Sequence, residues 1–180
     1  MMATPRIPSR IHPKKLDDYL EVMTRAVFQA GMSWSAIAER WDDFREAFCN
    51  FDVARVAMFT EGDFDRLSHM DGIVHSNRKI RATVKNAQTL LEVDNSHGGF
   101  GKYLRSFPTY EALSADIRER FKFLGEMSVW YLLFRVREPV PEFDIWVRTI
   151  PGHHPRMREM VELAAVEDLQ AASSGAPFHV

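Results

Sequence analysis

The chain has 180 residues, of which 46% are hydrophobic and 27% are charged, and its formal net charge is −2. These values are ordinary for a globular protein, and no apolar run approaches the length needed to cross a bilayer. A single cysteine, Cys49, excludes an intrachain disulfide and any zinc or iron–sulfur site built on several cysteines of this chain. The basic N-terminal stretch lacks a following apolar segment, so we expect no secretory signal and an intracellular location.

Apolar residues recur at helical spacing along nearly the whole chain. In chain order, the predicted helices cover 16–27, 37–48, 53–59, 63–69, 77–93, 103–106, 110–121, 126–137, 144–150 and 155–171. Ser33 and Asp52 are placed to cap two of them. Three glycines predict a break across 95–101, and a loose tail is expected over about 172–180. No segment alternates convincingly, so the predicted fold is all-α, a single helical domain over 1–180.

Two parts of the sequence resemble a known family. The run 28–34, Phe-Gln-Ala-Gly-Met-Ser-Trp, resembles the QAGLSW signature of the 3-methyladenine DNA glycosylase I family. Phe-Lys-Phe-Leu-Gly at 121–125 resembles the hairpin segment of that family, and the resemblance covers roughly 15–137. It implies a two-lobed helix-hairpin-helix DNA glycosylase fold, with the helix-hairpin-helix at about 110–137 and a DNA-binding cleft between the lobes.

The chain also departs from the family at two kinds of position. The family has an acidic residue three positions before the glutamine of its signature, where it reads the methylated base, and this chain has Ala26 there. The cysteines and histidines that bind zinc in the family have no counterparts in type and place. We therefore predict no metal and no cofactor, and the sequence does not name the lesion.

Asp144 is the predicted catalytic residue. Phe143–Arg148 resembles the V-D-x-x-V-x-R segment of the wider superfamily, in which the catalytic aspartate follows the hairpin glycine at about this spacing, here 144 − 125 = 19 residues. A fixed carboxylate stabilises the positive charge that develops on the deoxyribose or orients the attacking water. The alternative is that Asp144 only caps a helix. Met127 stands where lyase-type members carry a nucleophilic lysine, which implies a monofunctional enzyme.

Three residues are predicted to bind the extruded base. Trp34 can stack on it, with core packing as the equal alternative. Gln29 can reach the base edge, and the alternative is a glutamine whose side chain is bonded to backbone. Trp146 can line the pocket or pack beneath it.

Four residues are predicted to contact the rest of the DNA. Lys122, Gly125 and Ser128 lie in or beside the hairpin, where a glycine lets backbone N–H groups approach a phosphate. Met32 can wedge into the gap that the flipped nucleotide leaves, or fill the core. An ordinary helix–helix turn is the alternative for the hairpin.

Together these observations predict a monofunctional DNA glycosylase that removes a damaged, alkylated base in base excision repair. The expected partner is double-stranded DNA that contains a damaged base, and no association with a membrane is expected. We expect the enzyme to be a monomer in the cytoplasm, associated with the bacterial nucleoid. The alternative from another class is a non-catalytic lesion-binding protein on the same scaffold, which the loss of the acid at Ala26 favours. A helical protein without a DNA role is a third possibility, supported only by the net charge.

Overall fold

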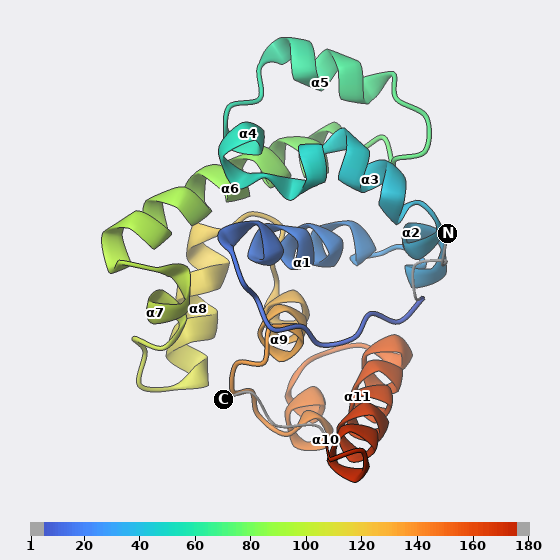
Figure 1. Ribbon diagram of the computed structural model, residues 1–180, viewed down its shortest axis with the longest axis vertical. Helices are drawn as coiled ribbons and strands as arrows, with labels where there is room; N and C mark the ends of the chain where they lie inside the picture. Colours follow the sequence, from blue (N-terminus) through green and yellow to red (C-terminus); the bar gives the residue numbers. More distant parts are fainter. Residues whose placement is uncertain (1–5, 176–180) are drawn as a thin grey trace.

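The computed structural model describes residues 6–175, and within them the chain forms helices and no strand (Figure 1), as predicted. The α-helices are α1 Leu16–Gln29, α2 Trp34–Glu39, α3 Trp41–Ala47, α4 Val53–Ala57, α5 Glu61–Ser68, α6 Asn77–His97, α7 Phe100–Leu104, α8 Tyr110–Arg120, α9 Glu126–Arg135, α10 Phe143–Trp146 and α11 Pro155–Ser173. The described residues also form two short 3₁₀ helices, Cys49–Phe51 and Val147–Thr149. None of the helices in this part of the chain is long and apolar enough to cross a membrane.

Local sequence accounts for most helix ends. The Ser33 hydroxyl accepts the N–H of Ala36, and the Asp52 carboxylate accepts the N–H of Arg55, so both predicted caps are present. The helix predicted over 37–48 is instead two helices, because the backbone leaves the helical region at Arg40. The bend lets the Trp41 indole N–H donate to the Glu21 carboxylate of α1 at 2.9 Å, which ties α3 to α1.

Two predicted boundaries were wrong. The break expected across 95–101 begins only at Gly98, which ends α6 in the left-handed conformation with φ of 67°. At the other end of the chain, α11 continues through Ser173, so the predicted loose tail begins too early. Residues 176–180 of that tail lie outside the described residues. At the end of α6 the polar residues before Gly98 are compatible with a helix, and the glycine ends it.

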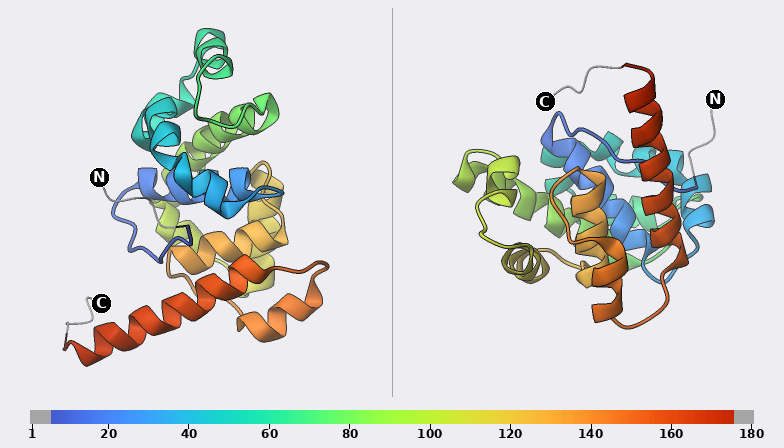
Figure 2. Two further views of the ribbon diagram at one scale, coloured as in Figure 1. Left: turned by 90° about the vertical axis from the view of Figure 1, so that its right-hand side faces the viewer. Right: turned by 90° about the horizontal axis from the view of Figure 1, so that it is seen from below.

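The helices form two groups on either side of α1, as expected for a two-lobed fold. Figure 1 shows α3–α6 on one side of α1 and α9–α11 on the other, and α1 contacts both α6 and α9. Figure 2 shows α11 extending past the body of the molecule. The core on the α3 side is rich in buried aromatic rings, namely those of Phe28, Trp41, Phe44, Phe48 and Phe51.

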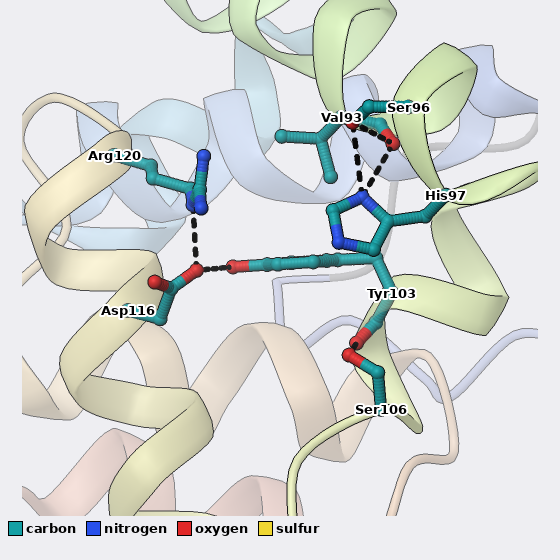
Figure 3. A network of polar contacts seen from close by, with 7 residues as sticks. All are labelled: Val93, Ser96, His97, Tyr103, Ser106, Asp116 and Arg120. Atoms are coloured by element: carbon teal, nitrogen blue, oxygen red, sulfur yellow. Dashed lines mark hydrogen bonds and ion pairs between the residues drawn. The ribbon is translucent and has the colours of Figure 1, made fainter.

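A polar cluster fixes the first helix of the hairpin against the rest of the protein (Figure 3). The buried Tyr103 hydroxyl on α7 donates to the Asp116 carboxylate on α8 at 2.6 Å, and the Arg120 Nε donates to the same oxygen. The His97 ring packs edge-on against the Tyr103 ring at 5.1 Å. Burial and the hydrogen bond to Asp116 raise the pKa of Tyr103 above its ordinary value. The cluster therefore holds α8 in place relative to α6 and α7.

Candidate active site

The turn between α8 and α9 is held by one buried side chain. The Asn86 side chain on α6 donates to the Lys122 carbonyl oxygen at 3.1 Å and accepts the Lys122 N–H at 2.7 Å. These two bonds fix the backbone at Lys122, whose side chain is exposed. Phe123 beside it is also exposed, and the Arg78 guanidinium lies over its ring at 5.4 Å. The turn is therefore rigid and carries two cationic groups.

Gly125 is the N-cap residue of α9, and neither its backbone conformation nor its surroundings require a glycine. Its φ of −88° suits any residue, and a Cβ built there would meet no atom within 4 Å. The absence of a side chain instead leaves the N–H groups at the start of α9 open to a partner. This fits the predicted contact with a phosphate.

A cavity of about 590 Å³ lies next to this turn. It is formed by the end of α1, the turn into α2, the first turns of α9 and the start of α11. The lining residues are Ala26, Gln29, Ala30, Gly31, Met32, Ser33, Trp34, Met127, Ser128, Tyr131, His153, His154, Pro155, Arg156 and Met157. Predicted base- and DNA-binding residues from distant parts of the sequence thus meet at one site.

Gln29 is the most unusual residue of the cavity. Its side chain is 4% exposed, and neither its amide nitrogen nor its amide oxygen has a hydrogen-bond partner among the described residues. Burying an amide without partners costs free energy, on the order of 1–3 kcal/mol, so such groups are rare in folded proteins. An amide placed in this way is suited to a ligand that supplies both a donor and an acceptor.

Trp34 and Met32 both line the cavity. The half-buried Trp34 ring packs edge-on against the Tyr131 ring at 5.5 Å, which leaves it as a wall of the cavity. Met32 follows Gly31, whose φ is 74°, and its side chain is 38% exposed. An exposed apolar side chain at a tight turn beside the cavity fits the predicted wedge better than the core alternative.

The remaining predicted residues lie elsewhere than expected. Ser128, which was predicted to contact phosphate beside the hairpin, lines the cavity. Trp146 does not line the cavity and is stacked on Trp130 with the ring centroids 5.4 Å apart. Asp144 is exposed and absent from the cavity lining, and its carboxylate accepts a hydrogen bond from Arg158 at 2.5 Å. Glu142, rather than Asp144, occupies the cap position of α10. The apolar face of α10 takes Phe143 and Trp146 into the core, which turns Asp144 outward.

Sequence reasoning missed the part of the cavity that comes from the start of α11. His153 and His154, which belong to no recognised motif, both line the cavity. The N-terminal region of α11 is distant in sequence from α1, so no motif could place it there. Within residues 6–175, no three His, Cys, Asp or Glu side chains are grouped to hold a metal ion.

The match to known proteins covers most of the chain. Residues 12–129 match the model of the methyladenine glycosylase family. DNA-3-methyladenine glycosylase 1 of Escherichia coli is 26% identical over 148 residues, 71% of this chain and 79% of that protein. The DNA-3-methyladenine glycosylase of Haemophilus influenzae is 30% identical over 89 residues, and the match spans about half of each protein, 49% of this chain and 48% of the relative.

Solved structures agree with these matches. The structure of 3-methyladenine DNA glycosylase I from Staphylococcus aureus is similar with a TM-score of 0.63 at 28% identity, over 70% of this chain and 78% of that one. A 3-methyladenine DNA glycosylase I variant in complex with 3-methyladenine is similar with a TM-score of 0.62 at 27% identity, over 70% of this chain and 79% of that one. On the family match and this shared helical fold, the chain belongs to the methyladenine glycosylase family.

Proposed function

We propose that this protein is a DNA glycosylase that acts as a monomer on double-stranded DNA and hydrolyses the N-glycosidic bond of a damaged, alkylated base. The observation that carries the proposal is the buried, unpartnered Gln29 amide in a cavity next to the hairpin. The cavity and the hairpin share the start of α9. A DNA strand whose phosphate is bound at Gly125 can therefore place an extruded base in the cavity.

Each part of the site has a task in this proposal. The N–H groups that follow Gly125, with the exposed Lys122, bind phosphate and position the strand. Met32 enters the gap that the base leaves in the duplex. Trp34 stacks on the base, and Gln29 bonds to its edge. Extrusion is necessary because the glycosidic bond cannot be reached inside the stacked duplex.

The hairpin assignment can be tested without disturbing the fold. We expect Gly125→Ala to lower the free energy of unfolding by no more than about 1 kcal/mol, since a Cβ meets no atom within 4 Å and alanine is only the poorer N-cap. Binding of a duplex should weaken by about tenfold, because the methyl group keeps a phosphate from the N–H groups of α9. A gel shift at several salt concentrations measures the affinity. Equal binding by wild type and variant would contradict the assignment.

We retain Asp144 as the proposed catalytic carboxylate. None of the described residues lining the cavity is Asp or Glu, while Asp144 pairs with Arg158, which follows the lining residue Met157 on α11. A carboxylate near the sugar would stabilise its positive charge as the base departs and water adds.

The decisive experiment compares base release from alkylated genomic DNA by wild type and Asp144→Asn. We expect the wild type to release base and the variant to be slower by about 100-fold, a usual loss when one stabilising group is removed. Glu142→Gln is the matched control, because it neutralises an exposed acid only two residues away. Binding of DNA by wild type without any release would instead identify a non-catalytic lesion-binding protein.

We also propose that the enzyme has no lyase activity. Met127 lines the cavity at the position of the lyase nucleophile, and none of the described lining residues is lysine. Without an amine in reach of the sugar, no Schiff base can form. Sodium borohydride added during turnover should therefore trap no covalent protein–DNA adduct, whereas an adduct on a denaturing gel would show that an amine attacks the sugar.

A further inference from the structure

The cavity wall offers few groups that can accept a proton. None of the described lining residues is Asp or Glu, and the imidazole rings of His153 and His154 are the lining side chains whose neutral form has a basic nitrogen. Hydrolysis of a glycosidic bond needs such a group, because the water that bonds to C1′ must lose a proton. The two histidines are therefore the candidates for this task.

The ring of the half-buried His154 is held in one orientation. Its Nε2 lies 3.0 Å from the Pro151 carbonyl oxygen. Since a carbonyl oxygen can only accept, Nε2 carries the proton and the lone pair of the neutral ring is on Nδ1. The His154 carbonyl oxygen in turn accepts the Arg158 N–H at 3.2 Å, which fixes the backbone that carries the ring. The residue thus presents Nδ1 as its hydrogen-bond acceptor.

Gly152 makes room for this ring. Its φ of 101° lies in the region that favours glycine, and a Cβ built there would lie 3.1 Å from Nε2 and 3.3 Å from Cε1 of His154. A methyl group at this position would therefore crowd the imidazole against the Pro151 turn. His153, the neighbour of His154 in the wall, is exposed. These contacts orient His154 rather than His153.

We propose that His154 is the general base of the reaction, with Nδ1 accepting a proton from the water that adds to C1′. The proposal rests on the glycosylase function proposed above and names a further catalytic residue for it. A purine alkylated at a ring nitrogen is cationic in the nucleoside. Its bond to C1′ breaks with the electrons passing to the base, which leaves as a neutral molecule without taking up a proton. Water forms the new bond to C1′ and gives a proton to His154, so the products are the free base, an abasic site and an imidazolium that returns its proton to solvent.

His154 and Asp144 have different tasks in this scheme. Asp144 pairs with Arg158, four residues after His154, so the start of α11 connects the two groups. The carboxylate stabilises the positive charge on the sugar, while the imidazole takes up the proton that water loses. The other titratable or charged side chains that line the cavity are those of His153, Tyr131 and Arg156.

The test is single-turnover release of 3-methyladenine from methylated DNA by the wild type, His154→Gln and His153→Gln. The glutamine amide nitrogen can replace Nε2 as the donor to Pro151, so His154→Gln removes the base while it retains this contact. We expect its rate to fall by about 100-fold, the usual loss when a general base is removed. His153→Gln is the matched control and should release base at close to the wild-type rate.

Two further readouts separate a general base from a structural residue. The wild-type rate should fall in acid, because a protonated imidazole accepts no proton, and this fall should be absent in His154→Gln. Added imidazole should restore base release by His154→Ala, while the DNA affinity of the variants and their urea unfolding should match the wild type.

The outcomes distinguish this proposal from the function on which it rests. Equal rates for wild type and His154→Gln would overturn the role of His154 and leave the glycosylase function intact. A loss of rate that follows a loss of DNA affinity, without rescue by imidazole, would also overturn it, because His154 would then only shape the wall. If the wild type releases no base, both proposals are wrong.

Discussion

Replacing Trp34 with alanine is expected to reduce base release by about 10- to 100-fold, the loss that corresponds to the stacking energy of one base on an aromatic ring. Trp34 is the aromatic wall of the cavity that begins α2, and it packs edge-on against Tyr131. The variant would leave the extruded base without a stacking partner. Single-turnover release from alkylated DNA measures the effect directly.

Two controls separate stacking from stability. Trp34→Phe retains a ring and should recover most of the activity. Trp146→Phe changes a tryptophan that stacks on Trp130 outside the cavity, so it should affect the free energy of unfolding rather than base release. If Trp34→Ala released base at the wild-type rate, Trp34 would be a packing residue, and the base would have to bind elsewhere.

Replacing Trp41 with alanine is expected to destabilise the fold by about 3–5 kcal/mol, the usual cost of deleting a large buried aromatic side chain. The ring is 1% exposed and is stacked on Phe44 at 5.1 Å and on Phe51 at 5.4 Å. Its loss would also remove the hydrogen bond to Glu21 and the ring beneath the Arg25 guanidinium. Urea unfolding followed by circular dichroism gives the free energy.

The matched substitutions show which part of the side chain matters. Trp41→Phe keeps a ring in the stack and loses the indole N–H, so it should cost about 1–3 kcal/mol. Leu169→Ala removes an apolar side chain that is 70% exposed on α11, and it should change stability by less than about 0.5 kcal/mol. A Trp41→Ala protein as stable as the Leu169→Ala protein would show that the core closes around the missing ring.

Trp41 and Trp34 illustrate how closely stability and the site are connected in this fold. Trp41 packs on Arg25, and the next residue in the chain, Ala26, is in the cavity wall. The end of α1 thus belongs to the aromatic core on one face and to the cavity on the other. For this reason, activity of core variants is best compared at a temperature where each remains folded.

The helices and most of their caps were determined by local sequence. Periodic apolar residues predict a helix because its turn places every third or fourth side chain on one face, and Ser33 and Asp52 cap helices through bonds within three residues. The QAGLSW-like run and the hairpin could also be recognised, since each is continuous in the chain. The two helices at Arg40 were not separable, because the apolar spacing continues across the bend.

Only the tertiary structure decided the composition of the cavity. The cavity brings α1 together with α9 and the start of α11, and contacts over such sequence distances depend on how whole helices pack. Packing therefore brought His153 and His154 into the wall, took Trp146 into the core and left Asp144 paired with Arg158 outside the lining. The sequence showed that Ala26 replaces an acid, but the buried, unpartnered amide of Gln29 beside it appeared only once the surrounding helices were in place.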